Sequence, residues 1–161
     1  DSILLDKGVG FVGFGTIPNR LETQALIELL AKEFPETEAY MSFTVQIPDA
    51  ISDGTSLAEN GQVVSQSKSD LGCRHQTVVH LFCINQALAF LKNAGKALIT
   101  YPNSGEVYDG DSQTWKPKDK RRLTLVEHSK YWHAHFGVKI LGGCCRTRPN
   151  DIKALYQEFR T

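Results

Sequence analysis

Two adjacent cysteines, Cys144 and Cys145, are the residues of this chain with the clearest capacity for chemistry. They follow an apolar run at 138–141 and two glycines, Gly142 and Gly143. Thiolates are the soft ligands that zinc prefers, so the pair suits a metal site. Neighbouring side chains on a strand point to opposite faces, so both sulfurs reach one ion only if the backbone leaves the strand, which the glycines would permit. The alternative is a buried pair of inert thiols.

The composition predicts a single globular domain. The chain has 161 residues, of which 41% are hydrophobic, with 18 basic and 18 acidic side chains. This balance gives no reason to expect nucleic acid or a membrane surface as a partner, and no apolar stretch approaches the length of a membrane span. The four cysteines are not needed as a disulfide framework in a chain of this size. We therefore expect a reducing, cytoplasmic setting without a secretory signal.

Short apolar runs alternate with amphipathic stretches along the chain. The periodicity predicts strands at 9–14, 39–45, 77–82, 97–101 and 138–141. It predicts helices from Asn19 to Pro35, over 83–93 with Gly95 as terminator, over 123–136 with Gly137 as terminator, and after Thr147, which is placed to act as the N-cap. Strands that alternate with helices imply a parallel sheet or barrel.

Three polar or glycine-rich segments follow predicted strands, at 15–19, 101–106 and 142–145. In parallel α/β folds, chemistry collects just beyond the carboxyl ends of the strands. We therefore expect these segments to lie together on one rim.

Several strings of this sequence match one known family. They are TIPN at 16–19, SFT at 42–44, ISDGT at 51–55, YPNSGEVYDG at 101–110 followed by Trp115, and GGCCRTRP at 142–149. With these motifs the sequence resembles the zinc-dependent homocysteine S-methyltransferases, most closely the bacterial type that uses S-methylmethionine. The resemblance covers nearly the whole chain apart from a segment at about 60–83.

The resemblance implies an α/β fold that is the C-terminal portion, about strands four to eight, of a (β/α)8 TIM-type barrel. The chain would be a single partial homocysteine-binding domain over residues 1–161. Its first residue, Asp1, is not a methionine, which agrees with a chain that begins inside a longer protein. A partial barrel would expose strand edges and part of its interior.

The implied reaction transfers a methyl group from a sulfonium donor to zinc-activated homocysteine and gives methionine. The donor would be S-methylmethionine or S-adenosylmethionine, and the nucleophile is the substrate's own thiol, so no side chain is expected to act as a nucleophile. The resemblance implies that Cys144 and Cys145 are two of three zinc ligands. Asn103 would contact the substrate or the loop that carries a ligand, or would simply form a turn. No role is assigned to Ser104 or Glu106.

Four other side chains of types often found in functional sites are expected to be packing or surface residues rather than ligands. They are Trp115, Trp132, His133 and His135.

At Gly15 the sequence departs from the family pattern, which has glutamate before TIPN. That carboxylate would pair with the amino group of homocysteine, so glycine removes a contact worth about 1.5–3 kcal/mol. The alternative is that Gly15 is a turn residue in a protein that binds differently.

The third zinc ligand is the second departure, because the family's Asn-Cys pair is missing from the atypical segment 60–83. Cys83 lies near the expected place, and Cys73 is the other candidate. One back-translation of residues 76–83 contains Asn-Cys in a shifted reading frame, which suggests a local frame change. Two other functions therefore stay open. One is a noncatalytic family member with weak or no zinc binding, and the other is a thiol redox protein, which adjacent cysteines suit poorly.

Overall fold

The computed structural model describes residues 7–43, 45–47, 49–66, 72–78, 84–117 and 123–160. The main sheet contains β1 (Phe11–Ile17), β2 (Glu38–Phe43), β5 (Gly72–Val78), β6 (Ala97–Thr100) and β9 (Ile140–Leu141). The helices are α2 (Arg20–Glu33), α3 (Leu57–Gln66), α4 (Ile84–Leu91), α5 (Leu125–Phe136) and α6 (Pro149–Phe159), with a 3-10 turn η1 at Lys92–Ala94. Two short antiparallel pairs join β3 (Val45–Ile47) to β4 (Ala50–Ile51) and β7 (Glu106–Asp109) to β8 (Thr114–Pro117).

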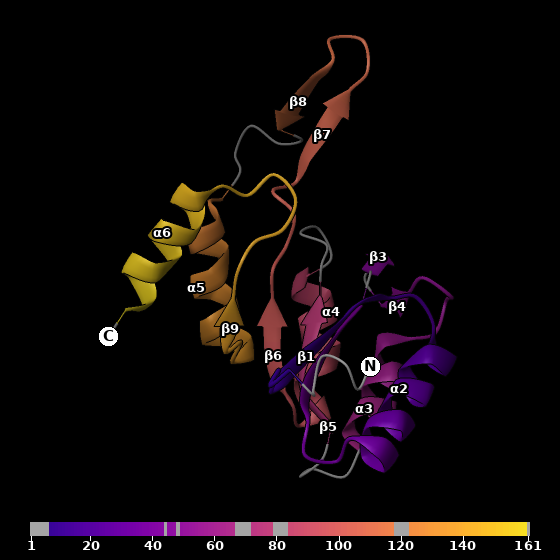
Figure 1. Cartoon of the computed structure of the whole chain (residues 1–161). Coiled ribbons are helices and arrows are strands. Elements are labelled where there is room, and N and C mark those ends of the chain that lie inside the picture. The colour runs from indigo at the N-terminus through magenta and orange to yellow at the C-terminus, as the bar shows by residue number, and fades with distance from the viewer. Residues whose placement is uncertain are drawn as a thin grey trace.

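The strands of the main sheet lie in the order β1-β2-β5-β6-β9, which is their order in the chain, and each neighbouring pair is parallel. A helix precedes each return to the sheet (Figure 1). A doubly wound sheet reverses its strand order at one point, and this sheet does not. All five carboxyl ends therefore meet along one edge, as the sequence predicted for its three polar segments.

Local signals set most helix ends where the sequence placed them. The Asn19 side chain accepts a hydrogen bond of 2.8 Å from the Glu22 backbone N–H at the start of α2. A reciprocal capping box joins Thr124 and Glu127 at the start of α5. Gly137 ends that helix with a φ of 68°, a left-handed conformation that glycine adopts without strain.

The strand predicted at 77–82 is confirmed at its first two residues, but it begins earlier than predicted. The strand that occupies this place is β5, which begins at Gly72 and ends at Val78. The residues of β5 pair on both sides, with β2 and with β6, and a single sequence does not display those partners. Residues 79–82 and Cys83 lie outside the described part of the chain.

One face of the sheet is buried under the helices. Ala39, Met41 and Phe43 of β2 are fully buried there. They belong to one hydrophobic cluster that the helices complete, with side chains such as Leu30, Leu57, Val64, Leu88 and Trp132. The intervening β2 residues, Tyr40 and Ser42, point to the other face because side chains alternate along a strand.

The β7–β8 hairpin projects beyond the carboxyl edge of the sheet (Figure 1). Tyr108 and Trp115 face each other across it with their ring centroids 5.4 Å apart. The hairpin therefore extends the rim on which the polar segments lie. Within the described residues, no helix is both long enough and apolar enough to cross a membrane.

Candidate functional site

Two loops at the carboxyl edge, one after β6 and one after β9, are joined by backbone hydrogen bonds. The Cys144 N–H donates to the Pro102 carbonyl and the Ser104 N–H donates to the Cys145 carbonyl, each at 2.8 Å. Gly142 N–H donates to the Thr100 carbonyl at the same distance. The YPNSGE and GGCC segments thus form a single rim, as the sequence predicted for these two of its three segments.

Cys144 and Cys145 are exposed, free thiols whose Sγ atoms lie 3.9 Å apart. The buried pair of inert thiols that the residue types left open is therefore not what the structure shows. The Cys145 N–H donates to Asn103 Oδ1 at 3.2 Å. Asn103 thus contacts the loop that carries the thiols, which is one of the two polar roles considered for it.

The chain leaves the strand at this point, as expected, although the two glycines contribute in a different way. Gly142 and Gly143 are not among the residues with positive φ; the left-handed residue is Arg146, at φ 67°. A Cβ on Gly143 would overlap the Thr147 side chain. Gly143 is therefore required for close approach of the chain rather than for an unusual backbone angle.

Thr147 does not cap the last helix, so that prediction is wrong. The N-cap of α6 is Arg148, whose backbone N–H donates to Asp151 Oδ2 at 2.7 Å, and Pro149 opens the helix. The Thr147 hydroxyl donates instead to the Cys144 carbonyl at 2.6 Å, and its N–H donates to the same oxygen at 3.0 Å. Thr147 therefore stabilises the turn formed by residues 144–147, which we call the cysteine turn.

The surroundings of the Cys144 thiol disfavour its thiolate form. Partial burial raises its pKa, and the neighbouring Cys145 thiol raises it further, while a backbone hydrogen bond from Cys145 lowers it. A bound cation reverses this effect because it favours the thiolate. A raised pKa makes Cys144 a poorer free nucleophile, and a bound metal would favour its thiolate.

The spacing of the two sulfurs fits a tetrahedral zinc ion. Ligand distances of about 2.3 Å and a tetrahedral angle place two sulfurs about 3.8 Å apart, and the observed separation is 3.9 Å. No group of three or more His, Cys, Asp or Glu side chains suited to a metal was found in the part of the chain that the structure describes. Cys83 lies outside that part. Cys73 is the second residue of β5 and lies near the amino end of that strand, whereas Cys144 follows the carboxyl end of β9. Because the strands are parallel, the two residues lie at opposite ends of the sheet, which argues against Cys73 as a ligand beside Cys144.

The first of the three rim segments begins later than predicted, because β1 extends to Ile17. Gly15 therefore lies inside the strand, and a Cβ on it would meet no atom within 4 Å. Thr16 has a φ of 60°, which is strained for a β-branched residue, and a register shift follows Phe14. The Thr16 N–H donates to Ser42 Oγ at 2.9 Å, which ties this kink to the end of β2.

Three residues that sequence analysis left without a role hold the cysteine turn from outside. Arg146 Nε donates to Glu106 Oε2 at 2.8 Å, and the Ser104 hydroxyl donates to the same oxygen at 3.3 Å. The Arg146 guanidinium also lies over the Trp115 ring, 5.1 Å from its centroid. The only sequence signal for their role was that all three residues lie within the two matched motifs at 101–110 and 142–149.

The other side chains set aside as packing or surface residues agree with that expectation. Trp132 is 1% exposed and donates to Asn85 Oδ1 at 2.7 Å. His133 and His135 lie on the outside of α5, where a ring nitrogen of each contacts a backbone carbonyl at 2.9 Å.

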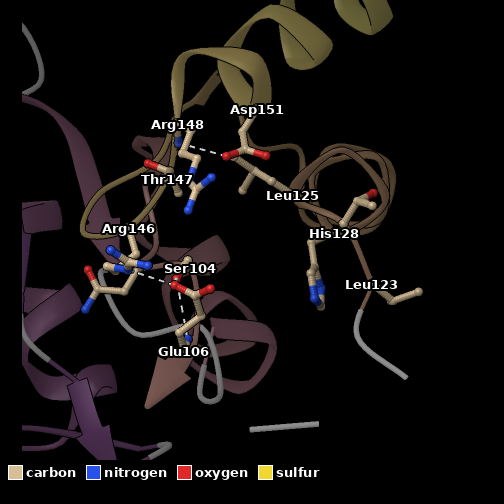
Figure 2. Close-up of a pocket in the computed structure, with 11 residues that line it drawn as sticks. Ser104, Glu106, Leu123, Leu125, His128, Arg146, Thr147, Arg148 and Asp151 are labelled. Atoms are coloured by element: carbon tan, nitrogen blue, oxygen red, sulfur yellow. Dashed lines mark hydrogen bonds and ion pairs between the residues drawn. The ribbon is translucent and has the colours of Figure 1, made fainter. Parts of the chain in front are cut away.

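A polar cavity of about 330 Å³ lies on the outer side of the rim. Arg146 and Glu106 line one wall, and His128 faces them from α5 (Figure 2). The start of α6 closes a further side with Arg148 and Asp151. The cavity separates the outer surface of the cysteine turn from α5.

The fold and the rim define a class of protein: a parallel α/β protein whose two adjacent thiols lie at the carboxyl edge of its sheet. Residues 2–159 match the family model described as homocysteine S-methyltransferase. The chain belongs to the homocysteine S-methyltransferase family.

Curated relatives agree with this assignment. The chain is 37% identical over 161 residues to the homocysteine S-methyltransferase of Escherichia coli, a match that covers 94% of the chain and 48% of the relative. It is 32% identical over 158 residues to homocysteine S-methyltransferase 1 of Brassica oleracea, covering 98% of the chain and 48% of the relative. It is 31% identical to the selenocysteine methyltransferase of Astragalus bisulcatus, over 96% of the chain and 46% of the relative. The chain thus spans about half the length of these relatives.

Solved structures agree as well. The structure is similar to the apo form of the homocysteine methyltransferase MmuM from Escherichia coli, with a TM-score of 0.76 at 30% identity over 96% of this chain and 52% of that one. The metallated form of MmuM gives the same TM-score at 29% identity, over 99% of this chain and 48% of that one. A metal therefore occurs in the family.

Proposed function

We propose that this chain supplies the thiol-bearing half of a homocysteine S-methyltransferase, which transfers a methyl group from a sulfonium donor to homocysteine. The single observation that carries the proposal is the pair of free thiols 3.9 Å apart on the carboxyl rim of a family member. In the reaction the sulfonium loses a methyl group to the sulfur of homocysteine, whose proton is released, and methionine is formed.

We infer that the sheet is the C-terminal part of a (β/α)8 barrel. Two features support this inference. The strand order follows the chain without reversal, and the large helices share one hydrophobic cluster on one face. A barrel places the opposite face, with Tyr40 and Ser42, toward its interior.

Cys144 and Cys145 would hold zinc, and the chemistry that zinc supplies when bound is a lowered pKa for a substrate thiol. The chain's own contribution is to keep the two ligands in place. Asn103 and Ser104 hold the backbone of Cys145 from the loop after β6. The third ligand is proposed to be Cys83.

Gly15 is proposed to lie where the substrate's amino group binds. It is next to the strained Thr16 at the carboxyl end of β1, and the space beside it is open. Because glycine offers no carboxylate, we expect this chain to hold the amino group of homocysteine more weakly than relatives with glutamate.

Metal binding and methyl transfer test the proposal in separate measurements. Zinc content and zinc affinity are measured for the purified chain and for the C144S/C145S double variant, with C73S as a matched control at the other edge of the sheet. We expect the double variant to lose zinc and C73S to retain it. Equal zinc affinity in all three proteins contradicts the proposal.

Methyl transfer to homocysteine is assayed with S-methylmethionine and with S-adenosylmethionine. Methionine formation that depends on Cys144 and Cys145 supports an enzyme, and the better donor identifies the sulfonium. Zinc binding without methionine formation favours the alternative, a family member that does not catalyse the reaction.

The origin of residues 60–83 is tested by sequencing the encoding DNA together with intact-mass measurement of the protein. An in-frame Asn-Cys codon pair supports a local frame change and would supply the missing ligand. A sequence that encodes the residues as printed contradicts that hypothesis.

A further inference from the structure

Arg146, the residue directly after the thiol pair, has an unusual backbone conformation. Its φ is 67°, and the other non-glycine residues with positive φ in the described chain are Thr16 and Gln113. The left-handed conformation is strained for a residue with a Cβ, and glycine adopts it without that strain. An arginine at this position therefore indicates that its side chain is used.

The Arg146 side chain is anchored at two points of the β7–β8 hairpin. Its Nε donates to Glu106 Oε2 at 2.8 Å, an ion pair in which the side chains of Arg146 and Glu106 are 36% and 24% exposed. Its guanidinium lies over Trp115. Figure 2 shows Arg146 directed at Glu106 and Ser104, with a dashed line marking the bond.

These contacts complete the support of the cysteine turn. On the upstream side, the Cys144 and Cys145 backbones are bonded to Pro102, Asn103 and Ser104. On the downstream side, the direction of the chain is set by the left-handed turn at Arg146. Anchoring that residue therefore restricts the backbone angles that place the two sulfurs 3.9 Å apart.

We propose that Arg146, anchored by Glu106 and Trp115, is the positioning residue for the Cys144–Cys145 pair, so that the hairpin sets how well the two thiols bind one soft ion. The role in metal binding rests on the proposed function, whereas the effect on thiol spacing does not. Arg146 acts through the backbone of the turn and is not itself a ligand.

The decisive variant is R146G, with Q113G as the matched control. Both changes relieve the same backbone strain, but only R146G removes the anchor. We expect R146G to weaken binding of Zn²⁺ and of Co²⁺, the latter followed by its thiolate charge-transfer absorption, by about tenfold, the change that corresponds to one charged contact. We expect its melting temperature to stay the same or rise. Q113G should leave metal affinity unchanged.

A metal-independent probe separates this inference from the proposed function. Phenylarsine oxide bonds to two neighbouring thiols, forming two As–S bonds and releasing one water, with no change in oxidation state. We expect its affinity to fall about tenfold in R146G and to be lost in C144S/C145S. If the unaltered chain binds the arsenical but no zinc, and R146G binds the arsenical about tenfold more weakly, the proposed metal site fails and the positioning role stands. If R146G binds both probes as the unaltered chain does, the positioning role is wrong.

The route through Glu106 is tested by a double-mutant cycle. E106Q and R146K should each lower the affinity for both probes. The double variant should bind them no less tightly than the single variant with the lower affinity, because the same contact is lost in each case. Fully additive losses would show that Arg146 does not act through Glu106.

Discussion

The two faces of β2 differ in what their side chains do. On the helix-covered face, Met41 and Phe43 are 0% exposed and belong to the hydrophobic cluster of the core. On the other face, Ser42 accepts a backbone hydrogen bond from Thr16, and Tyr40 stacks on Phe11 with ring centroids 5.5 Å apart and meets Tyr101 edge-on at 6.4 Å. One strand therefore serves stability on one side and a polar, aromatic surface on the other.

The difference teaches how a parallel sheet of this kind separates its tasks. Buried apolar side chains contribute stability roughly in proportion to the area removed from water. Groups on the opposite face can carry strain and polar atoms, as Thr16 does, because the packed face supplies the stability that compensates for them. Substitutions on the two faces should therefore differ in size and in kind.

The largest effect is expected for Phe43→Ala on the helix-covered face. The change leaves a cavity in the hydrophobic cluster and should lower the free energy of unfolding by about 3–5 kcal/mol, measured by urea denaturation. Tyr40→Phe on the opposite face removes only a hydroxyl and should cost less than about 1.5 kcal/mol. Equal losses for the two variants would contradict the separation of the faces.

A smaller effect is expected for Gly13→Ala, which tests how closely β1 and Tyr40 approach. A Cβ on Gly13 would lie 2.5 Å from the Tyr40 ring, so the ring must move. We expect a loss of about 1–3 kcal/mol in the free energy of unfolding and a changed tyrosine signal in near-UV circular dichroism. The control is Gly10→Ala, where a Cβ meets nothing within 4 Å. If Gly10→Ala costs as much, crowding against Tyr40 is not the cause.

Ser42→Ala should follow, with a loss of about 1–2 kcal/mol, because it leaves the Thr16 N–H without its acceptor. Amide hydrogen exchange at Thr16 should become faster, which locates the effect in the strained kink. Ser65→Ala on α3 is the control, since its hydroxyl donates only at an exposed helix position, to the Gln62 carbonyl. Unchanged exchange at Thr16 would contradict the role given to Ser42.

The smallest effect is a pH dependence on the surface of the helix layer. Hydrogen bonds from the backbone and then the side chain of Thr124 lower the pKa of Glu127 below its usual value of 4.5. A carboxyl whose folded pKa is lowered contributes stability above its unfolded pKa, and that contribution is lost as pH falls through the folded pKa. Glu127→Gln should therefore lower the melting temperature at pH 7, and the difference should shrink below pH 4.5. Thr124→Ala, which removes the hydroxyl that donates to Glu127, is the comparison, and an unchanged pH dependence there would show that the side-chain bond of the cap is not responsible.

Sequence patterns predicted α2, α4, α5 and α6 because local signals mark their ends, whereas α3 was not predicted. Asn19 caps α2 and Gly137 ends α5, as the residue types indicated. The part of β5 before Thr77 was missed because its pairing with the two strands beside it cannot be seen in a single sequence. The N-cap of α6 was missed because the Thr147 hydroxyl donates a hydrogen bond to the Cys144 carbonyl instead of capping the helix.

The candidate site divides in the same way. The cysteine pair could be recognised from residue types and from a family motif, and Asn103 from its place after a strand. The partnership of Arg146 with Glu106 and Trp115 could not, because those residues are separated by about 30 to 40 positions and meet only where the hairpin reaches the turn.

The sequence by itself determined the family, the parallel α/β class and the two thiols, because each is written in local chemistry: motif strings, apolar periodicity and residue type. The tertiary structure alone decided that the two sulfurs lie 3.9 Å apart. It also decided that the turn that carries them is held by the contact of Arg146 with the β7–β8 hairpin. The physical reason is that spacing and anchoring depend on contacts between loops after β6 and β9. Those loops become neighbours only when their strands pair in the sheet.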